Sequence, residues 1–257
     1  MQLTSSGISF LELSEKWCDF FYDIDDIKKN GAKISLSIGS LTSINIAVFP
    51  KLYQNLITRV PKIDLSIITS HSLDMFNLIE KKHIDIGLSF ISISSQNVQV
   101  YKLYAEPIIG ICFKDSLLAG KSSIGARDLN LENELYVRWD NQFQDWHNKF
   151  FDNNHTLGTK LDNAELILNL FSNEKQWAIV PLSVAIFAKN KLNFATFELN
   201  NNNYQRDTYL IMHKTPKQSA RFDIKIFLSQ LKNLEKFVEP EFSKNAVFFM
   251  QNLPKAL

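Results

Sequence analysis

Three hydroxyl side chains lie in the four-residue stretch SLTS, residues 40–43, between an apolar strand pattern and an apolar helix pattern. The first turn of a helix has backbone N–H groups without intrahelical partners, and its partial positive charge attracts anions. Hydroxyl groups beside these N–H groups add further donors. We therefore predict that Ser40, Thr42 and Ser43 bind a carboxylate or a similar acceptor group. The alternative is that Thr42 or Ser43 only caps the helix.

Further polar or aromatic side chains stand where other predicted strands end or helices begin. In an open α/β sheet, ligands bind beyond the carboxyl ends of the strands, so these side chains are expected to rim one site. Trp139 can stack on a flat ligand there, or it can be an ordinary aromatic residue of the core. The remaining candidates are Ser70, His71 and Ser92 in the first half of the chain, and Asp140, Asp162 and Asn163 in the second half.

The sequence contains none of the common catalytic or cofactor-binding signatures. It lacks G-x-G-x-x-G, the phosphate-binding G-x-x-x-x-G-K-[ST], H-E-x-x-H and C-x-x-C, and its five histidines are not spaced as metal ligands. His147 and Trp146 lie on a predicted helix, where a lone histidine is typically a surface or packing residue. We therefore expect no metal, no cofactor and no enzymatic activity, although a catalytic triad assembled across the fold remains an alternative.

The composition indicates a globular protein that does not bind nucleic acid by itself. The chain has 257 residues, of which 45% are hydrophobic, and a net charge of +1, so it has no basic footprint for DNA. No run of about 18 apolar residues is present to span a membrane, and the N-terminus does not resemble a signal peptide. Cys18 and Cys112 fit packed thiols in a reducing compartment. These features predict a cytoplasmic protein.

Strand and helix patterns alternate along most of the chain, which predicts two α/β units. The first unit has strands at 33–38, 62–69 and 84–90 and helices at 43–60 and 71–82, the rhythm of a mostly parallel, three-layer sheet. The second unit, from about 106 to 212, has strands at PIIGICF, LYVRW, TLGTKLD, WAIV, FATFEL and DTYLIMH and helices at 141–152 and 163–173. A last helix at 219–234 is predicted to direct Phe222, Ile226 and Leu231 or Leu234 inward.

Pro50 interrupts an otherwise regular amphipathic helix. Ile44, Val48, Leu52 and Leu56 recur every four residues and so share one face of the helix. A proline in a helix interior removes one backbone donor and crowds the preceding turn, at a cost of about 3 kcal/mol. We therefore predict that the helix is kinked or restarts at Pro50.

The N-terminal segment carries a heptad pattern. Its apolar residues are three or four positions apart, as at the a and d positions of a coiled coil: Phe10, Leu13, Trp17, Phe20, Ile24 and Ile27. Such a helix can pack on the core of its own domain or against a partner chain. We predict a partner chain, because charged residues and Gly31 separate this helix from the first strand and leave its apolar stripe uncovered.

Several segments together resemble the co-inducer-binding region of LysR-type transcriptional regulators with its linker helix. LTSSGISFLE (3–12) is similar to the segment where the winged helix-turn-helix of that family ends and the linker begins. The segment from ISLSIGS to LITRVP resembles the first strand, effector loop and proline-containing helix. LIEKKHIDIGLSF, with Asp85, and WAIVPLS, with Pro181, resemble two later family motifs. LYVRWDNQFQDWHNKFF resembles the subgroup that includes regulators of flagellar genes.

The resemblance implies a type II periplasmic-binding-protein fold, in which two Rossmann-like subdomains enclose a cleft and a long linker helix precedes them. It implies a division into the end of the wing and the linker (1–32), subdomain I (33–110 and 213–237), subdomain II (111–212) and a C-terminal extension (238–257). A small effector would bind at the SLTS turn. The chain would form a homodimer or homotetramer, and it would contact DNA only through a winged helix-turn-helix that it does not include.

The sequence departs from the family pattern at three places. Glu174 and Gln176 replace glycines before the WAIVPLS motif, and Lys82 or His83 replaces another glycine. Residues 238–257 have no counterpart in the resemblance. A solute-binding protein of a transport system has a similar fold and is the alternative function, but it would need a signal sequence and no heptad helix. An enzyme on the same two-lobed scaffold is a third hypothesis.

Overall fold

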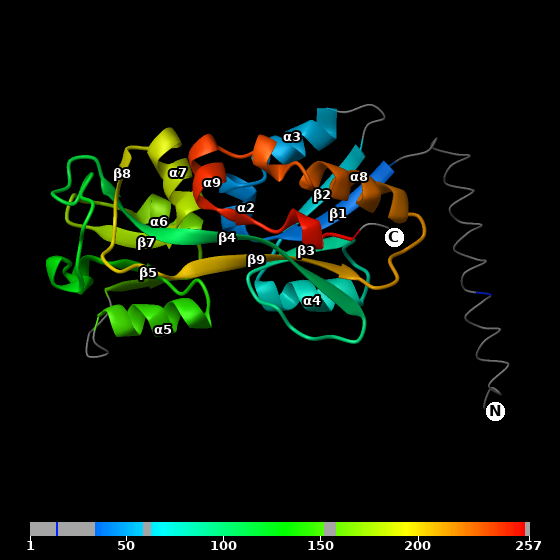
Figure 1. The fold of residues 1–257 in the computed structure, drawn as a ribbon, viewed down its shortest axis with the longest axis horizontal. Helices are drawn as coiled ribbons and strands as arrows, with labels where there is room; N and C mark the ends of the chain where they lie inside the picture. The colour runs from blue at the N-terminus through cyan, green and yellow to red at the C-terminus, as the bar shows by residue number, and fades with distance from the viewer. Residues whose placement is uncertain (1–13, 15–33, 59–62, 152–157, 255–257) are drawn as a thin grey trace.

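The computed structural model describes Ser14 and residues 34–58, 63–151 and 158–254 (Figure 1). The predicted heptad residues and Cys18 lie outside these ranges, so the linker helix remains a prediction. The fold is a mixed α/β structure. Its helices pack on a large sheet that extends along the long axis of the molecule (Figure 1).

The first α/β unit has the predicted strand and helix order. Strand β1 lies between β2 and β3 and is parallel to both. Leu36 and Ile38 point to the same face of β1 and are fully buried in the cluster that contains residues of α3 and α8. The elements are β1 (Ile34–Ser40), α2 (Thr42–Ala47), α3 (Pro50–Thr58), β2 (Ile63–Thr69), α4 (Ser72–Glu80) and β3 (Ile86–Ser89).

The helix pattern around Pro50 forms two helices, as predicted. Helix α2 ends at Ala47, where the N–H groups of Val48 and Phe49 both donate to the carbonyl of Ile44, each at 3.0 Å. Pro50 is the first residue of α3, a position where its missing N–H removes no helical hydrogen bond. The apolar face is continuous across the break, since the four residues that predicted it are all at most 1% exposed.

Two antiparallel strands connect the two halves of the molecule. Strand β4 (Val98–Phe113) pairs with β9 (Gln205–His213) from Val98 opposite His213 to Pro107 opposite Gln205. The register of this ladder shifts between Lys102 and Tyr104, which is a β-bulge with Leu103 as the extra residue. Strand β9 also pairs with β3, while β4 continues to pair with β7 and β8, so one sheet contains strands of both halves.

The second α/β unit contains one helix that the sequence analysis missed. Helix α7 follows Pro181, and six of its ten residues are buried, including Val184, Ala185 and Ala188. A helix buried on nearly all sides has no amphipathic period to reveal it. The elements are β5 (Leu135–Val137), α5 (Asn141–Phe150), β6 (Thr159–Leu161), α6 (Ala164–Leu170), β7 (Trp177–Pro181), α7 (Leu182–Lys191) and β8 (Phe194–Phe197), with short 3₁₀ turns η1 (Ala126–Asp128) and η2 (Leu131–Asn133).

The C-terminal part returns to the first half of the sheet. Helix α8 packs against β1 and α3, but the prediction that Phe222 points inward is wrong, because this side chain is 61% exposed. Ile224 and Phe227 of α8 are fully buried instead, together with the predicted Leu231. The elements are α8 (Arg221–Leu231), η3 (Leu234–Lys236), α9 (Pro240–Asn245), β10 (Val247–Phe248) and η4 (Met250–Asn252).

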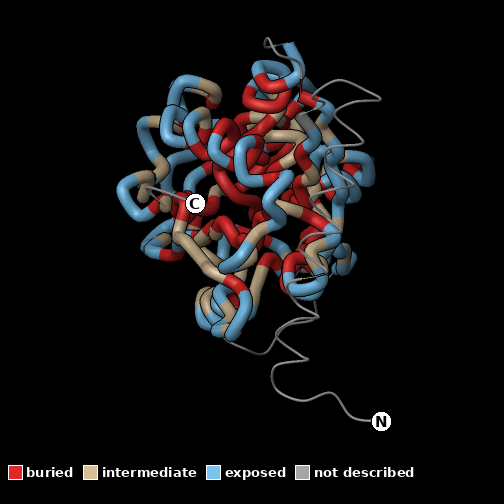
Figure 2. Tube along the Cα trace, turned by 90° about the vertical axis from the view of Figure 1, so that its right-hand side faces the viewer, coloured by how far each residue is buried: buried red, intermediate tan, exposed pale blue. Residues whose placement is uncertain are grey.

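The buried side chains form two main clusters. Figure 2 shows that the buried residues, in red, lie mainly in the interior of the chain trace. We call the part around the first cluster, with β1–β3, α2–α4 and α8, the first lobe. The part around the second cluster, with β5–β8 and α5–α7, is the second lobe. A smaller cluster lies between α4 and the sheet of the first lobe.

Candidate functional site

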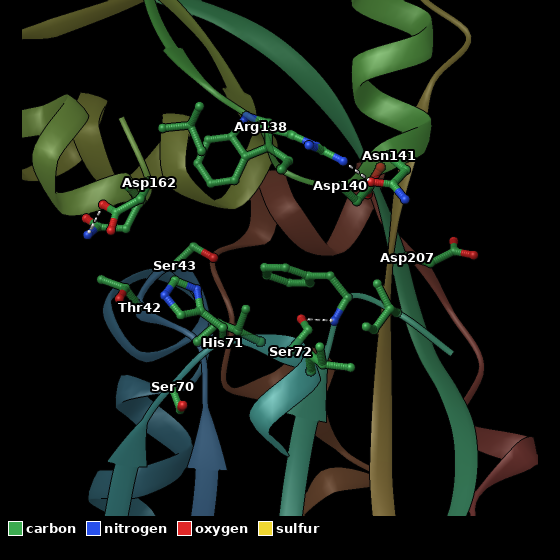
Figure 3. Close-up of a pocket in the computed structure, with 18 of the residues that line it drawn as sticks. Thr42, Ser43, Ser70, His71, Ser72, Arg138, Asp140, Asn141, Asp162 and Asp207 are labelled. Carbon is green, nitrogen blue, oxygen red and sulfur yellow. Dashed lines mark hydrogen bonds between the residues drawn. The ribbon is translucent and has the colours of Figure 1, made fainter. Parts of the chain in front are cut away.

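A cavity of about 1000 Å³ lies between the two lobes and is lined by residues of both (Figure 3). Nine of the ten predicted site residues line it: Thr42, Ser43, Ser70, His71, Ser92, Trp139, Asp140, Asp162 and Asn163. Ser40 does not line the cavity, because it is the last residue of β1 and is fully buried. The structure therefore brings together side chains that are far apart in the sequence.

The starts of four helices meet at this cavity, and they are capped differently in the two lobes. In the first lobe, Leu41 and His71 are the N-cap residues of α2 and α4, and no side chain caps either helix. The alternative that Thr42 or Ser43 caps α2 is therefore wrong, since both residues are already inside the helix. In the second lobe, Asp140 caps α5 and Asn163 caps α6 by accepting from the backbone N–H groups three residues later. The helix starts of the first lobe, which have no side-chain cap, therefore share the cavity with the side-chain-capped helix starts of the second lobe.

Among the described residues that line the cavity, Arg138 is the only lysine or arginine. In a continuous strand, Arg138 would alternate with Val137 and Trp139 and would face away from a site lined by Trp139. Strand β5 ends at Val137, so the alternation does not extend to Arg138. The guanidinium is exposed and donates to the side chain of Asn141 at the cavity (Figure 3).

Three carboxylates also line the cavity, and two of them have partners that hold them in place. Asp140 accepts from the Phe143 N–H at 2.7 Å and from the Tyr204 hydroxyl at 2.6 Å. Burial, followed by this hydrogen bond, raises the pKa of Tyr204 well above its usual value, so the phenol remains a donor. Asp207, which sequence analysis missed, pairs with the Lys102 ammonium at 2.8 Å. Asp162 accepts only a neutral donor among the described residues, the Asn163 amide, at 2.8 Å.

A fully buried ion pair lies beneath the cavity, between β4 and β9, the two crossing strands that connect the lobes. Arg206 of β9 is directly opposite Glu106 of β4, and its guanidinium donates to the carboxylate at 2.6 Å. Glu106 also accepts the N–H of Ser183 at 2.8 Å, at the start of α7 in the second lobe. The other side of the guanidinium lies 3.5 Å from the Ser43 hydroxyl in the first lobe.

The same guanidinium supports two aromatic walls of the cavity. It lies 3.8 Å from the ring centre of Phe90, which follows β3, and 5.3 Å from that of Trp139. The Trp139 indole also donates to the carbonyl of Ile179 at 2.9 Å, so this residue is both a core residue and a wall of the cavity. Arg206 therefore contacts cavity-forming residues from both lobes.

His147 is a packing residue, as the sequence analysis expected for a lone histidine. It is 1% exposed and its Nε2 lies 2.9 Å from the Glu134 carboxylate, away from the residues that line the cavity. Within residues 34–58, 63–151 and 158–254, no group of three or more His, Cys, Asp or Glu residues is arranged to hold a metal ion. No helix in the same described ranges is long and apolar enough to cross a membrane.

Several solved structures share this fold. A full-length OxyR variant from Pseudomonas aeruginosa is 17% identical, with a TM-score of 0.65 over 91% of this chain and 78% of that chain. CbnR, a LysR family transcriptional regulator, is 18% identical, with a TM-score of 0.62 over 91% of this chain and 82% of that chain. The BenM effector-binding domain with its effector benzoate is 16% identical, with a TM-score of 0.61 over 80% of this chain and 95% of that chain.

The family assignment comes from the sequence itself. No curated protein sequence matches the chain significantly. The family model described as the LysR substrate binding domain matches residues 29–232, which include both lobes and every residue that lines the cavity. This match favours the regulatory reading over the transport alternative. The chain belongs to the LysR substrate-binding domain family, with the type II periplasmic-binding-protein fold.

Proposed function

We propose that the inter-lobe cavity binds a small metabolite and that this binding changes the relative position of the two lobes in a transcriptional regulator. The observation that carries the proposal is the composition of the cavity wall. Polar side chains at four helix starts, two from each lobe, converge on one space of about 1000 Å³, so a single small molecule can contact both lobes. A metabolite that binds one lobe arrangement better than another shifts the population toward it.

The effector that suits this wall carries a carboxylate or similar acceptor and also donor groups. The Thr42 hydroxyl and the Arg138 guanidinium are two of the donors that the wall offers to an acceptor group. The carboxylate of Asp162 faces the same space and is an acceptor for a donor on the ligand. An effector with acceptors alone would leave this carboxylate without a partner of opposite charge.

The remaining parts of the function follow from the family. We propose a non-enzymatic, cytoplasmic homodimer or homotetramer that assembles through the heptad segment at residues 10–27. DNA contact would come from a winged helix-turn-helix outside this chain. We also propose the division into subdomain I (33–110 and 213–237), subdomain II (111–212) and extension (238–257); the packing of α8 on β1 and α3 supports it.

Native mass spectrometry of the purified protein tests the proposal by looking for a co-purified small molecule. A thermal-shift panel of benzoate, amino acids and short dicarboxylates provides candidate ligands where none co-purifies. For any ligand found, Thr42→Val retains the side-chain shape but removes the hydroxyl. A hydrogen bond to a charged group contributes about 1.5–3 kcal/mol, so calorimetry should show about tenfold weaker binding or more.

Thr58→Val is the matched control, because Thr58 is an exposed residue at the end of α3, outside the cavity wall. Its affinity should equal that of the wild type. Equal affinity of the Thr42→Val and wild-type proteins would mean that the ligand binds away from Thr42. If Arg138→Ala also left the affinity unchanged, this cavity would be rejected as the binding site.

A further inference from the structure

Residues 238–253 form a segment that the family match does not include, since that match ends at residue 232. The segment contains α9, β10 and η4, and none of its residues lines the cavity. We propose that this segment is a brace that clamps the bulge of the crossing strand β4 and holds the two lobes at a fixed angle. The importance of that angle for effector binding rests on the proposed function; the brace itself does not.

The brace docks on β4 at its bulge. Strand β10 pairs antiparallel with β4, with Val247 opposite Ala105 and Phe248 opposite Tyr104. The N–H of Phe249 donates to the carbonyl of Leu103 at 2.9 Å, and Leu103 is the residue between the two registers of the β4–β9 ladder. A bulge leaves a residue unpaired and bends its strand. The brace therefore supplies a hydrogen-bond partner at the point where the crossing strand bends.

Apolar side chains anchor the brace to the same strand. Tyr104 of β4 packs edge-on against Phe242 of α9, with ring centres 5.6 Å apart, and lies 6.2 Å from the Phe248 ring. Phe242 is 2% exposed and Leu253 is 3% exposed, and both belong to the buried cluster of the first lobe. Burial of these apolar side chains stabilises the contact, so the segment is firmly attached to the first lobe.

Two ion pairs connect the brace to opposite lobes. Glu239 binds Lys51 of α3, in the first lobe, at 2.8 Å, and Glu241 binds Lys189 of α7, in the second lobe, at 3.4 Å. Figure 1 shows α9 lying between α3 and α7, in agreement with these contacts. Both ion pairs are exposed, so they contribute little to stability. Their role is to fix the direction of α9 relative to both lobes, while the aromatic contacts hold it in place.

A distance measurement between the lobes tests the brace without any ligand. Spin labels are attached to Lys81→Cys in the first lobe and Leu117→Cys in the second, both exposed positions, in a background with Cys18→Ser and Cys112→Ala. Deletion of residues 238–257 and the single change Phe242→Ala should each broaden or shift the inter-label distance distribution. The control is Leu228→Ala, which removes a buried side chain of the first lobe outside the brace and should leave the distribution unchanged.

Two results would overturn the proposal. One is a distribution identical to the wild type in both the deletion and the Phe242→Ala proteins. The other is an equal broadening in Leu228→Ala, which would mean that any loss of packing loosens the lobes. If the deletion prevents folding, Phe242→Ala alone decides the question. Failure of the cavity to bind any metabolite would not alter these distances, so the proposed function and the brace are tested separately.

Discussion

The buried Glu106–Arg206 pair gives a prediction whose size follows from the contacts that each partner retains. In Glu106→Gln, the guanidinium loses its one carboxylate partner among the described residues and keeps the Ser43 hydroxyl at 3.5 Å and the Phe90 ring at 3.8 Å. Removing one partner of a buried ion pair costs about 3–5 kcal/mol, so we expect a loss in this range in the free energy of unfolding.

The opposite change should cost less. In Arg206→Met, the Glu106 carboxylate keeps the Ser183 N–H at 2.8 Å, at the start of the ten-residue helix α7. A charge-assisted hydrogen bond of this kind contributes about 1.5–3 kcal/mol, and the helix start stabilises the negative charge further. We therefore expect both variants to have a lower free energy of unfolding, with a loss in Arg206→Met that is smaller than that in Glu106→Gln by about 1.5–3 kcal/mol. The double variant should lose less than the sum of the two single losses.

Urea unfolding at neutral pH, followed by circular dichroism, measures the free energy of unfolding of the wild type, the two single variants and the double variant. Asp207→Asn is the matched control, because Asp207 and Lys102 also form an ion pair between β9 and β4, but with side chains 29% and 34% exposed. The control should lose about 1 kcal/mol or less. The reasoning would be refuted if Glu106→Gln cost no more than Asp207→Asn, or if Arg206→Met were the more destabilising of the two single variants.

Three other predictions concern titration, assembly and reactivity. Burial raises the pKa of Asp223 from 3.8 to about 6, so the stabilisation from its protonated form is complete below about pH 4 and is lost as the pH rises through about 6. Urea unfolding should show the stability difference between wild type and Asp223→Asn changing over this range and constant above it; a constant difference throughout would contradict the assignment. Trp17→Glu with Phe20→Glu should lower the mass in light scattering, and an unchanged mass would place the assembly surface elsewhere. Burial raises the pKa of the Cys112 thiol to about 11, so in a Cys18→Ser variant thiol reagents at about pH 8 should modify Cys112 only after unfolding, and rapid modification of the native variant would disagree.

Sequence analysis predicted the elements whose apolar residues recur with a clear period. It missed a helix that is buried on nearly all sides, and it could not assign the direction of a side chain just beyond the end of a strand. The four-residue spacing identified the face shared by α2 and α3, whereas α7 is buried on nearly all sides and has no period to detect. Phe222 fitted the helical spacing in α8, but the face of a helix that packs is decided by neighbours far away in the chain. Strand alternation does not determine the direction of Arg138, because β5 ends one residue earlier, at Val137.

The site was predictable where it depends on local order along the chain. Nine site residues lie where predicted strands end or predicted helices begin, so α/β topology was sufficient to group them. The Glu106–Arg206 pair lies outside that reasoning, since its partners are 100 residues apart in the sequence. Only the register of β4 against β9 brings them into contact. The segment that pairs with the β4 bulge was likewise left without any prediction.

The division of one apolar helix pattern into α2 and α3 has a consequence for how movement passes along this part of the chain. Helix α2 packs against α6 and α7 of the second lobe, whereas α3 packs on β2 and α8 of the first. Because no helical hydrogen bond is donated by Pro50, a displacement of α2 is not transmitted to α3 through a continuous helix. A substitution at Thr42 can therefore alter the cavity wall without directly displacing the helix that packs on β2 and α8. Pro50 mechanically separates the helix that lines the cavity from the helix that packs inside the first lobe.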